Sequence, residues 1–249
     1  MSRSATLHSS GKYRFLADIS AYSAGVATEP GHELIGVHFD EPLAVAEAFS
    51  RLDEECAERG VPIHALVAVA LRSPLPFEFG TFDDFNREYR KLLADRGLLE
   101  GDTNPIARTN VVPVLGAPRE PVLLSAFLVR EATGHGGTDF VVSGGAELDD
   151  LRADAIVARG DISSHGLERK AAHVIEEMRS RSAALGHDPQ AATEVNVYTA
   201  HEVPGLTDVL VARLPGLAGH GFRRWIARPP VTELEFEMDI RRVTAWQVL

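Results

Sequence analysis

From Asn104 to Val114 the chain carries the stretch NPIARTNVVPV, which predicts a loop that leads into a short strand. Pro105 favours an extended backbone at the residue before it, and the β-branched residues that follow favour a strand. Arg108 stands at the start of this strand. An arginine on a rigid backbone can hold a carboxylate through two parallel hydrogen bonds, whereas an arginine on a solvated strand end contributes little. The stretch alone is compatible with both interpretations.

Outward from this stretch, the first half of the chain predicts strands and helices in alternation. Residues 63–71 form a nearly continuous apolar run, which is typical of a strand covered on both faces. Apolar residues at helical spacing predict one helix that follows the acidic segment Asp40–Pro42 and ends at Gly60, and a second helix that begins near Thr81. Further strands are expected at residues 13–19, 32–39 and 121–130.

The same order of elements returns after Gly134-His135-Gly136-Gly137, the most linker-like segment of the chain. Ser163 and Ser164 open a helix that ends at Gly186 and carries apolar residues at helical spacing. These apolar positions are Leu167, Ala171, Val174 and Met178. Another helix is expected over residues 204–214, and strands over 139–144, 193–199, 222–227 and 233–243. Corresponding elements lie about 110 to 130 residues apart, which indicates an internal duplication.

We therefore predict an α+β fold built from two similar domains in tandem. The predicted parts are a mobile N-terminus (1–12), a first domain (13–132), a glycine-rich linker (133–137) and a second domain (138–249). Each half has few helices, so they cover only one face of a mostly antiparallel sheet. The other face must find a partner, either the other half of the chain or another subunit.

The composition narrows the class of protein. A hydrophobic fraction of 45% with 24% charged residues is that of an ordinary globular protein. The net charge of −11 and the lack of long basic runs argue against a nucleic-acid partner. No apolar run approaches the roughly 20 residues that span a bilayer, and residues 1–12 lack the apolar core of a secretory signal. With Cys56 as its one cysteine, the chain is expected in the reducing cytoplasm, away from membranes.

Strong site motifs are missing from the sequence. It contains no phosphate loop, dinucleotide fingerprint, zinc-binding motif or serine-hydrolase elbow. The histidines are scattered, and His201 or His220 would be an isolated ligand, so no metal site is predicted. Glycines between Ser143 and Glu147 allow main-chain N–H groups to approach an anionic ligand, but a tight turn explains them equally well.

A second candidate feature is a row of acidic residues near the C-terminus. Alternation along a strand places four carboxylates on one face. They are Glu233, Glu235, Glu237 and Asp239. On a solvated face they confer solubility; in a closed cleft they raise one another's pKa, and one can then carry a proton near neutrality.

These features together resemble a known family. The order of elements is similar to that of the RidA/YjgF family of enamine/imine deaminases. The motifs that support this are Tyr22-Ser23, Asp84–Tyr89, Pro105–Val111, Phe140–Gly144 and Leu234–Glu237. The two-domain layout resembles more closely the CnbZ-type 2-aminomuconate (2-amino-5-chloromuconate) deaminases. The stretches that support the closer resemblance are Tyr22–Val26, Leu71–Pro74, Asn104–Asn110, Arg159–Asp161, Val197–Thr199 and Arg228–Asp239.

The resemblance implies a homotrimer with a chorismate-mutase-like arrangement and clefts between adjacent domains. The family arginine that holds the substrate carboxylate falls on Arg108, and the family glutamate that activates water falls on Glu235. The strand end that surrounds the substrate falls on Ser143 and Gly144. We add Tyr22, Glu147, Arg224 and Arg228 as candidate substrate-binding residues, and His220 as a candidate catalytic residue.

Two departures from the family pattern matter. The first half has Leu123 at the glutamate position, and the second half has His220 at about the arginine position. One interpretation is a composite site in which Arg108 of the first half faces Glu235 of the second. In the other, the second half works alone, with His220 or the pair Arg223-Arg224 holding the anion.

The implied activity is hydrolytic deamination of an enamine or imine carboxylic acid such as 2-aminomuconate, which needs no metal or organic cofactor. A muconate has two carboxylates, so a second cation is expected at its far end, with Arg72, Arg224 and Arg228 as candidates. The alternatives are a non-catalytic trimer that binds a small carboxylate as a sensor or carrier, and a chorismate-type hydrolase on the same fold.

Overall fold

The computed structural model describes residues 4–58, 60–134 and 136–249. Among these residues the strands β1 to β13 form two sheets, sheet 1 and sheet 2. Sheet 1 has the order β11 (Ala227–Arg228), β6 (Ala107–Pro113), β5 (Leu66–Arg72), β7 (Val122–Glu131), β4 (His32–Ala44), β13 (Ala245–Val248). Sheet 2 has the order β1 (Thr6–Leu7), β2 (Tyr13–Leu16), β3 (Gly25–Thr28), β8 (Phe140–Ala146), β12 (Glu237–Arg242), β9 (Glu194–Tyr198), β10 (Arg223–Trp225).

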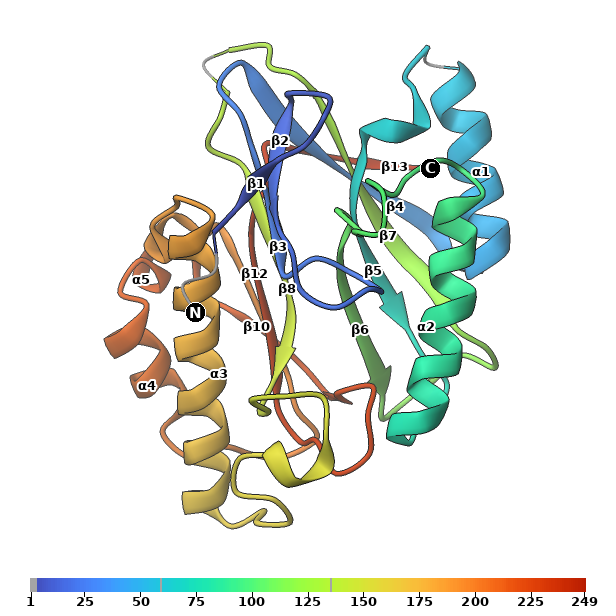
Figure 1. The fold of residues 1–249 in the computed structure, drawn as a ribbon. Helices are drawn as coiled ribbons and strands as arrows, with labels where there is room; N and C mark the ends of the chain where they lie inside the picture. Colours follow the sequence, from blue (N-terminus) through green and yellow to red (C-terminus); the bar gives the residue numbers. More distant parts are fainter. Residues whose placement is uncertain (1–3, 59, 135) are drawn as a thin grey trace.

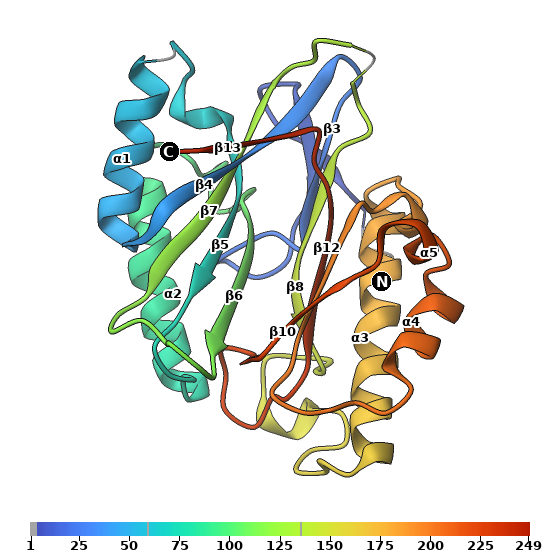
Figure 2. The ribbon, with the colours of Figure 1, turned by 180° about the vertical axis from the view of Figure 1, so that it is seen from behind.

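The helices lie on the outer faces of the two sheets (Figures 1 and 2). Those of the first half are α1 (Val45–Glu58) and α2 (Phe79–Ala94). Those of the second half are α3 (Ser164–Ala184), α4 (Leu206–Arg213) and α5 (Leu217–His220). Each half thus repeats strands interleaved with helices, and most strand pairs are antiparallel. The α+β fold and the repeated order of its elements agree with the prediction from the sequence.

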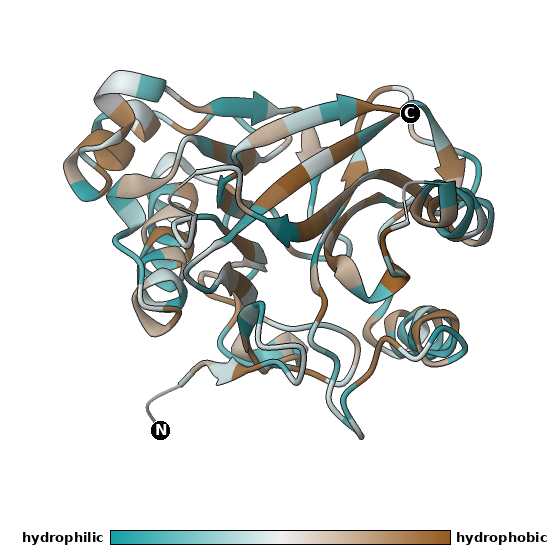
Figure 3. Ribbon diagram, turned by 90° about the horizontal axis from the view of Figure 1, so that it is seen from above, coloured by the Kyte–Doolittle hydropathy of each residue, from teal (hydrophilic) through white to brown (hydrophobic). Residues whose placement is uncertain are grey.

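The inner faces of the sheets pack against each other within one chain. A buried apolar cluster joins residues of both sheets, among them Phe15 and Val141 of sheet 2 and Leu34, Val67 and Phe127 of sheet 1. Two further clusters lie between each sheet and its helices, and the view from above shows apolar strands between the outer helices (Figure 3). The uncovered sheet face therefore finds its partner in the other half. The homotrimer concerns contacts between chains and stays a prediction.

Each end of the chain adds strands to the sheet of the other half. The sequence did not predict this exchange. The N-terminal hairpin enters sheet 2, where Val26 of β3 pairs with Val141 of β8. The C-terminal strand β13 enters sheet 1, parallel to β4. Thr6 and Leu7, assigned to a mobile N-terminus, form β1 against β2. The sheets therefore do not follow the predicted ranges 13–132 and 138–249, and the linker 133–137 includes His135, which lies outside the described residues.

Local signals set most element boundaries. The Ser163 hydroxyl accepts the Gly166 N–H and starts α3, and Gly186, with φ of 87°, follows its end. Asp40–Pro42, expected at the start of a helix, lie instead in β4, whose register against β7 shifts between His38 and Leu43. No helix among the described residues is long and apolar enough to cross a membrane.

Candidate active site

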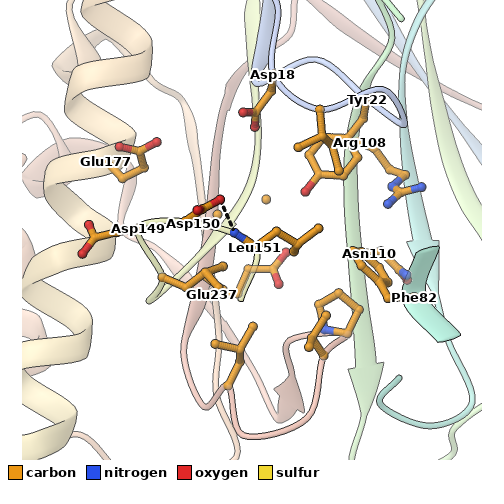
Figure 4. Close-up of a pocket in the computed structure, with 18 of the residues that line it drawn as sticks. Asp18, Tyr22, Phe82, Arg108, Asn110, Asp149, Asp150, Leu151, Glu177 and Glu237 are labelled. Atoms are coloured by element: carbon orange, nitrogen blue, oxygen red, sulfur yellow. Dashed lines mark hydrogen bonds between the residues drawn. The ribbon is translucent and has the colours of Figure 1, made fainter. Parts of the chain in front are cut away.

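A cavity of about 250 Å³ opens where β6 of sheet 1 faces β8 and β12 of sheet 2. Figure 4 shows Tyr22, Arg108 and Asn110 on the side of sheet 1, with Glu177 of α3 on the opposite side. Glu237 of β12 also lines it. The cavity is thus built from both halves of one chain, as the composite interpretation requires.

Arg108 lies on β6 with its guanidinium surrounded by aromatic rings. Its Cζ is 4.5 Å from the ring centre of Tyr22, and three rings of α2 lie close by. These three are Phe82 at 5.7 Å, Phe85 at 5.5 Å and Tyr89 at 4.9 Å. Nη2 donates to Asn86 Oδ1 at 2.7 Å, whereas Nη1 is buried without a hydrogen-bond partner among the described residues. The rings favour the cation, and the unpaired N–H requires an acceptor.

Asn110 is the next residue on the same face of β6, because side chains alternate along a strand. Its Oδ1 accepts the Ser73 hydroxyl at 3.0 Å. Its Nδ2 is buried and lacks a partner among the described residues, and the residue lines the cavity. Arg108 and Asn110 therefore each bring an unpaired N–H donor to one cavity, which suits an anionic ligand.

Glu237, the first residue of β12, lies opposite these donors. Burial, and then the neighbouring carboxylates of Asp239 and Glu147, raise the pKa of Glu237 well above its ordinary value. Arg72 and Arg181 lower that pKa only in part. Glu237 therefore holds its proton at a pH where an exposed glutamate is ionised, and it can donate a proton in this cavity.

Ser143 and Gly144, predicted at a strand end, lie within β8, which continues to Ala146, and they join the sheets beside these groups. The Ser143 hydroxyl accepts the main-chain N–H of Arg108 at 3.0 Å and donates to the Ser23 carbonyl at 2.6 Å. Gly144 N donates to Thr109 Oγ1 at 3.1 Å. A Cβ at Gly144 would overlap the Glu237 carboxyl group. Ser143 thus positions Arg108, and Gly144 makes the space that Glu237 occupies.

The structure does not bring Glu235 into this cavity. Its carboxylate contacts Arg228 Nη1 and lies 2.8 Å from His201 Nε2. The predicted strand from Glu233 begins only at Glu237, because Glu233 has φ of 68° and pairs with Arg159 outside the ladder. The structure thus places Glu237 rather than Glu235 in the cavity with Arg108, and Arg228 lies with Glu235. The catalytic roles of these residues stay predictions.

Three other candidates also lie elsewhere. Glu147 is buried, accepts the N–H groups of Glu235 and Phe236, and pairs with Lys170 at 3.2 Å, so it fixes the segment before β12. His220 is exposed at the end of α5, and Arg224 pairs with Glu202 at 2.7 Å. Neither lines the cavity among the described residues, so the second half does not build the anion site with them.

A cavity residue that we did not predict is Arg181 of α3. The buried stripe of this helix runs through Leu167, Ala171, Val174 and Met178. The next position at helical spacing is Arg181, and its burial follows from that spacing. An arginine that continues an apolar stripe is the sequence signal that could have identified it.

Fold and cavity define a duplicated α+β protein in which an arginine of one half and a carboxyl group of the other, with a raised pKa, line one cavity. Residues 5–247 match the family model described as 2-aminomuconate deaminase CnbZ. The 2-amino-5-chloromuconate deaminase of Comamonas testosteroni is 37% identical over 249 residues, which cover 98% of this chain and 99% of that protein. The chain belongs to the CnbZ family of 2-aminomuconate deaminases.

Solved structures of smaller proteins align with part of the chain. A putative endoribonuclease of Thermotoga maritima covers 45% of this chain and 89% of its own, with 20% identity and a TM-score of 0.30. TdcF of E. coli with bound serine covers 45% and 91%, with 13% identity and a TM-score of 0.29.

Proposed function

We propose that this protein is a hydrolytic deaminase that converts an enamine or imine carboxylic acid of the 2-aminomuconate class to the 2-oxo acid and ammonia. The observation that carries the proposal is the pair of unpaired buried donors, Arg108 Nη1 and Asn110 Nδ2, in the cavity that also holds the protonatable Glu237. The donors suit a carboxylate, and Glu237 suits the proton transfers. Membership of the CnbZ family supports the substrate class.

The reaction needs four proton transfers, which one carboxyl group can serve in turn. Protonated Glu237 first gives its proton to the enamine carbon, and the iminium ion (the protonated imine) forms. The resulting Glu237 carboxylate then takes a proton from the water that adds to the C=N carbon. The protonated Glu237 then delivers that proton to the amino nitrogen. Ammonia leaves as the Glu237 carboxylate takes the proton of the hydroxyl group, which forms the ketone and restores protonated Glu237. One water is consumed, one ammonia is released, and no electrons are exchanged, so the residues and water suffice.

Arg108 holds the substrate during these steps. A carboxylate bound to a fixed guanidinium places the adjacent amino carbon at a set distance from the cavity wall, and such positioning supplies a large part of an enzyme's acceleration. The aromatic rings around Arg108 fix its orientation and exclude water. Arg108 supplies a permanent positive charge to a cavity whose lining also includes the carboxylates of Asp18, Asp149, Asp150 and Glu177.

The direct test is ammonia release. The purified protein is mixed with freshly generated 2-aminomuconate, and ammonia is followed by a coupled glutamate dehydrogenase assay against the spontaneous rate. We expect the enzyme to raise the rate at least about 100-fold, as positioned proton transfer allows. Binding of 2-oxo acids without any increase in ammonia release would contradict the proposal and support a carboxylate-binding protein instead.

The pH dependence should report the raised pKa of Glu237. The free enzyme needs protonated Glu237 for its first step, so kcat/KM should be constant at acidic pH and fall about tenfold per pH unit above the raised pKa. The measurement is kcat/KM at saturating coupling enzyme from about pH 5 to 9. A kcat/KM that instead rises with pH through the range where ordinary carboxyl groups ionise would show that Glu237 starts as a carboxylate base.

A further inference from the structure

A second guanidinium reaches the cavity from the other half of the chain. Arg181 of α3 lines the same cavity as Arg108, with its side chain 9% exposed. Its Nε donates to Glu177 Oε1 at 2.8 Å, one turn earlier on the helix. A Cβ at Gly145 would lie 3.3 Å from Arg181 Nη1, so the glycine makes room for the guanidinium beside β8. Helix and strand together hold Arg181 in place.

Among the described residues, the terminal nitrogens of Arg181 make long contacts. Nη1 lies 3.5 Å from the carbonyl oxygens of Ser143 and Gly144, and Nη2 lies 3.7 Å from Asp18 Oδ2. Charge-assisted hydrogen bonds between nitrogen and oxygen are about 2.7 to 2.9 Å long. A guanidinium has five N–H donors, so Arg181 can keep its Glu177 contact and still donate strongly to a ligand carboxylate.

Arg108 and Arg181 line the same cavity. Among the cavity-lining residues that the structure describes, they are the two with a permanent positive charge. Both lower the pKa of the half-buried Tyr22 phenol, whose pKa is raised overall by desolvation. Arg181 also lowers the pKa of Glu237, which burial and neighbouring carboxylates raise overall. The cavity therefore has one cation from each half of the chain. The charges of both arginines interact electrostatically with Tyr22 and Glu237.

We propose that Arg181 binds the second carboxylate of a dicarboxylate substrate, while Arg108 binds the carboxylate beside the amino group. This rests on the proposed function and assigns the residue that selects a dicarboxylic enamine over a monocarboxylic one. The three arginines that the sequence suggested for this role do not line the cavity among the described residues. They are Arg72, which faces Tyr198 and Trp225, and Arg224 and Arg228, each of which pairs with a glutamate.

The test compares two stable ligands with the same carbon skeleton. Trans,trans-muconate has two carboxylates, whereas sorbate has a methyl group in place of the second. Binding of each is measured by titration calorimetry to the full-length protein, to Arg181→Gln and to the matched control Arg179→Gln. Arg179 lies two residues away on α3 and pairs with Glu176 on the exposed side.

We expect Arg181→Gln to weaken muconate binding about 10- to 100-fold, as loss of a hydrogen bond between charged groups does, and to change sorbate binding less than threefold. Arg179→Gln should change neither. Equal effects of Arg181→Gln on both ligands, or no effect on muconate, would overturn the assignment.

Two additions keep the result decisive. If Arg181→Gln fails to fold, Arg181→Lys replaces it: it keeps the charge but loses the planar fork, and it should weaken muconate alone by several-fold. A lysine variant that binds both ligands like the wild type, or loses both equally, would overturn the assignment. Ammonia release by the wild type is scored separately, so a failed deaminase assay and a failed muconate preference are distinct results.

Discussion

Glu237→Gln is expected to lower kcat/KM for 2-aminomuconate by about 10²- to 10⁴-fold, the contribution of a positioned general acid–base group. Glutamine keeps the size and a hydrogen-bonding amide but cannot give up and regain a proton. Glu237 is buried, lines the cavity and has a pKa well above its ordinary value. The measurement is initial-rate ammonia release over a range of substrate concentrations, with the variant's fold checked by circular dichroism.

Glu235→Gln is the matched control for this variant. Glu235 lies two residues earlier, where its carboxylate contacts Arg228 and His201. We expect less than a fivefold change in kcat/KM, because a partly exposed ion pair contributes little. A large loss in Glu235→Gln together with near-normal activity in Glu237→Gln would restore the assignment that family resemblance suggested and remove ours.

The choice between these two glutamates shows a limit of sequence patterns. Glu235 and Glu237 are two residues apart, so strand alternation places both side chains on the same face of a strand. Alternation therefore cannot tell which of the two is functional. The deciding feature is where the ladder begins, and β12 pairs with β9 only from Glu237 onward. Glu233 has a left-handed backbone, with φ of 68°, and it keeps residues 233–236, which come before β12, out of the ladder. Nothing in the local composition encodes that start.

Elements set by local chemistry were predictable, whereas those set by long-range pairing were not. The cap at Ser163 and the glycine at 186 mark α3 because they satisfy the helix ends nearby. The exchange of β3 and β13 between the halves depends on strands more than 100 residues apart, such as Val26 with Val141. The arginine at the start of the strand was predictable; its glutamate partner on the opposite sheet required the tertiary structure.

Two cavity groups, Glu237 and Arg108, share one energetic property. Burial raises the pKa of Glu237 and lowers that of Arg108, and desolvation is the largest cause of both shifts. A lowered arginine pKa means that the charged form is less favourable in the folded state than in the unfolded state. This cost is present at every pH below the folded-state pKa, which includes neutral pH. Buried charged groups of this kind are retained for function at the expense of stability.

Arg108→Met should therefore separate activity from stability. We expect kcat/KM to fall about 10²- to 10⁴-fold, because two charge-assisted hydrogen bonds to the substrate carboxylate are lost. The free energy of unfolding should not fall, and should rise by up to about 2 kcal/mol, because an apolar side chain replaces a buried charge among aromatic rings. The gain is limited, since Asn86 Oδ1 loses its donor.

The measurements are ammonia release and urea unfolding at pH 7, with Arg87→Met as the control. Arg87 lies on α2 with its side chain 71% exposed and pairs with Asp84 at the surface, so its replacement should leave both activity and unfolding nearly unchanged. If Arg108→Met loses more than about 2 kcal/mol of stability, the arginine serves the packing of its aromatic neighbours. If it stays active, the substrate carboxylate is bound elsewhere. Loss of activity without loss of stability is the result that a carboxylate-binding arginine requires. In that case the buried Arg108 Nη1, which lacks a partner among the described residues, serves to bind the substrate carboxylate.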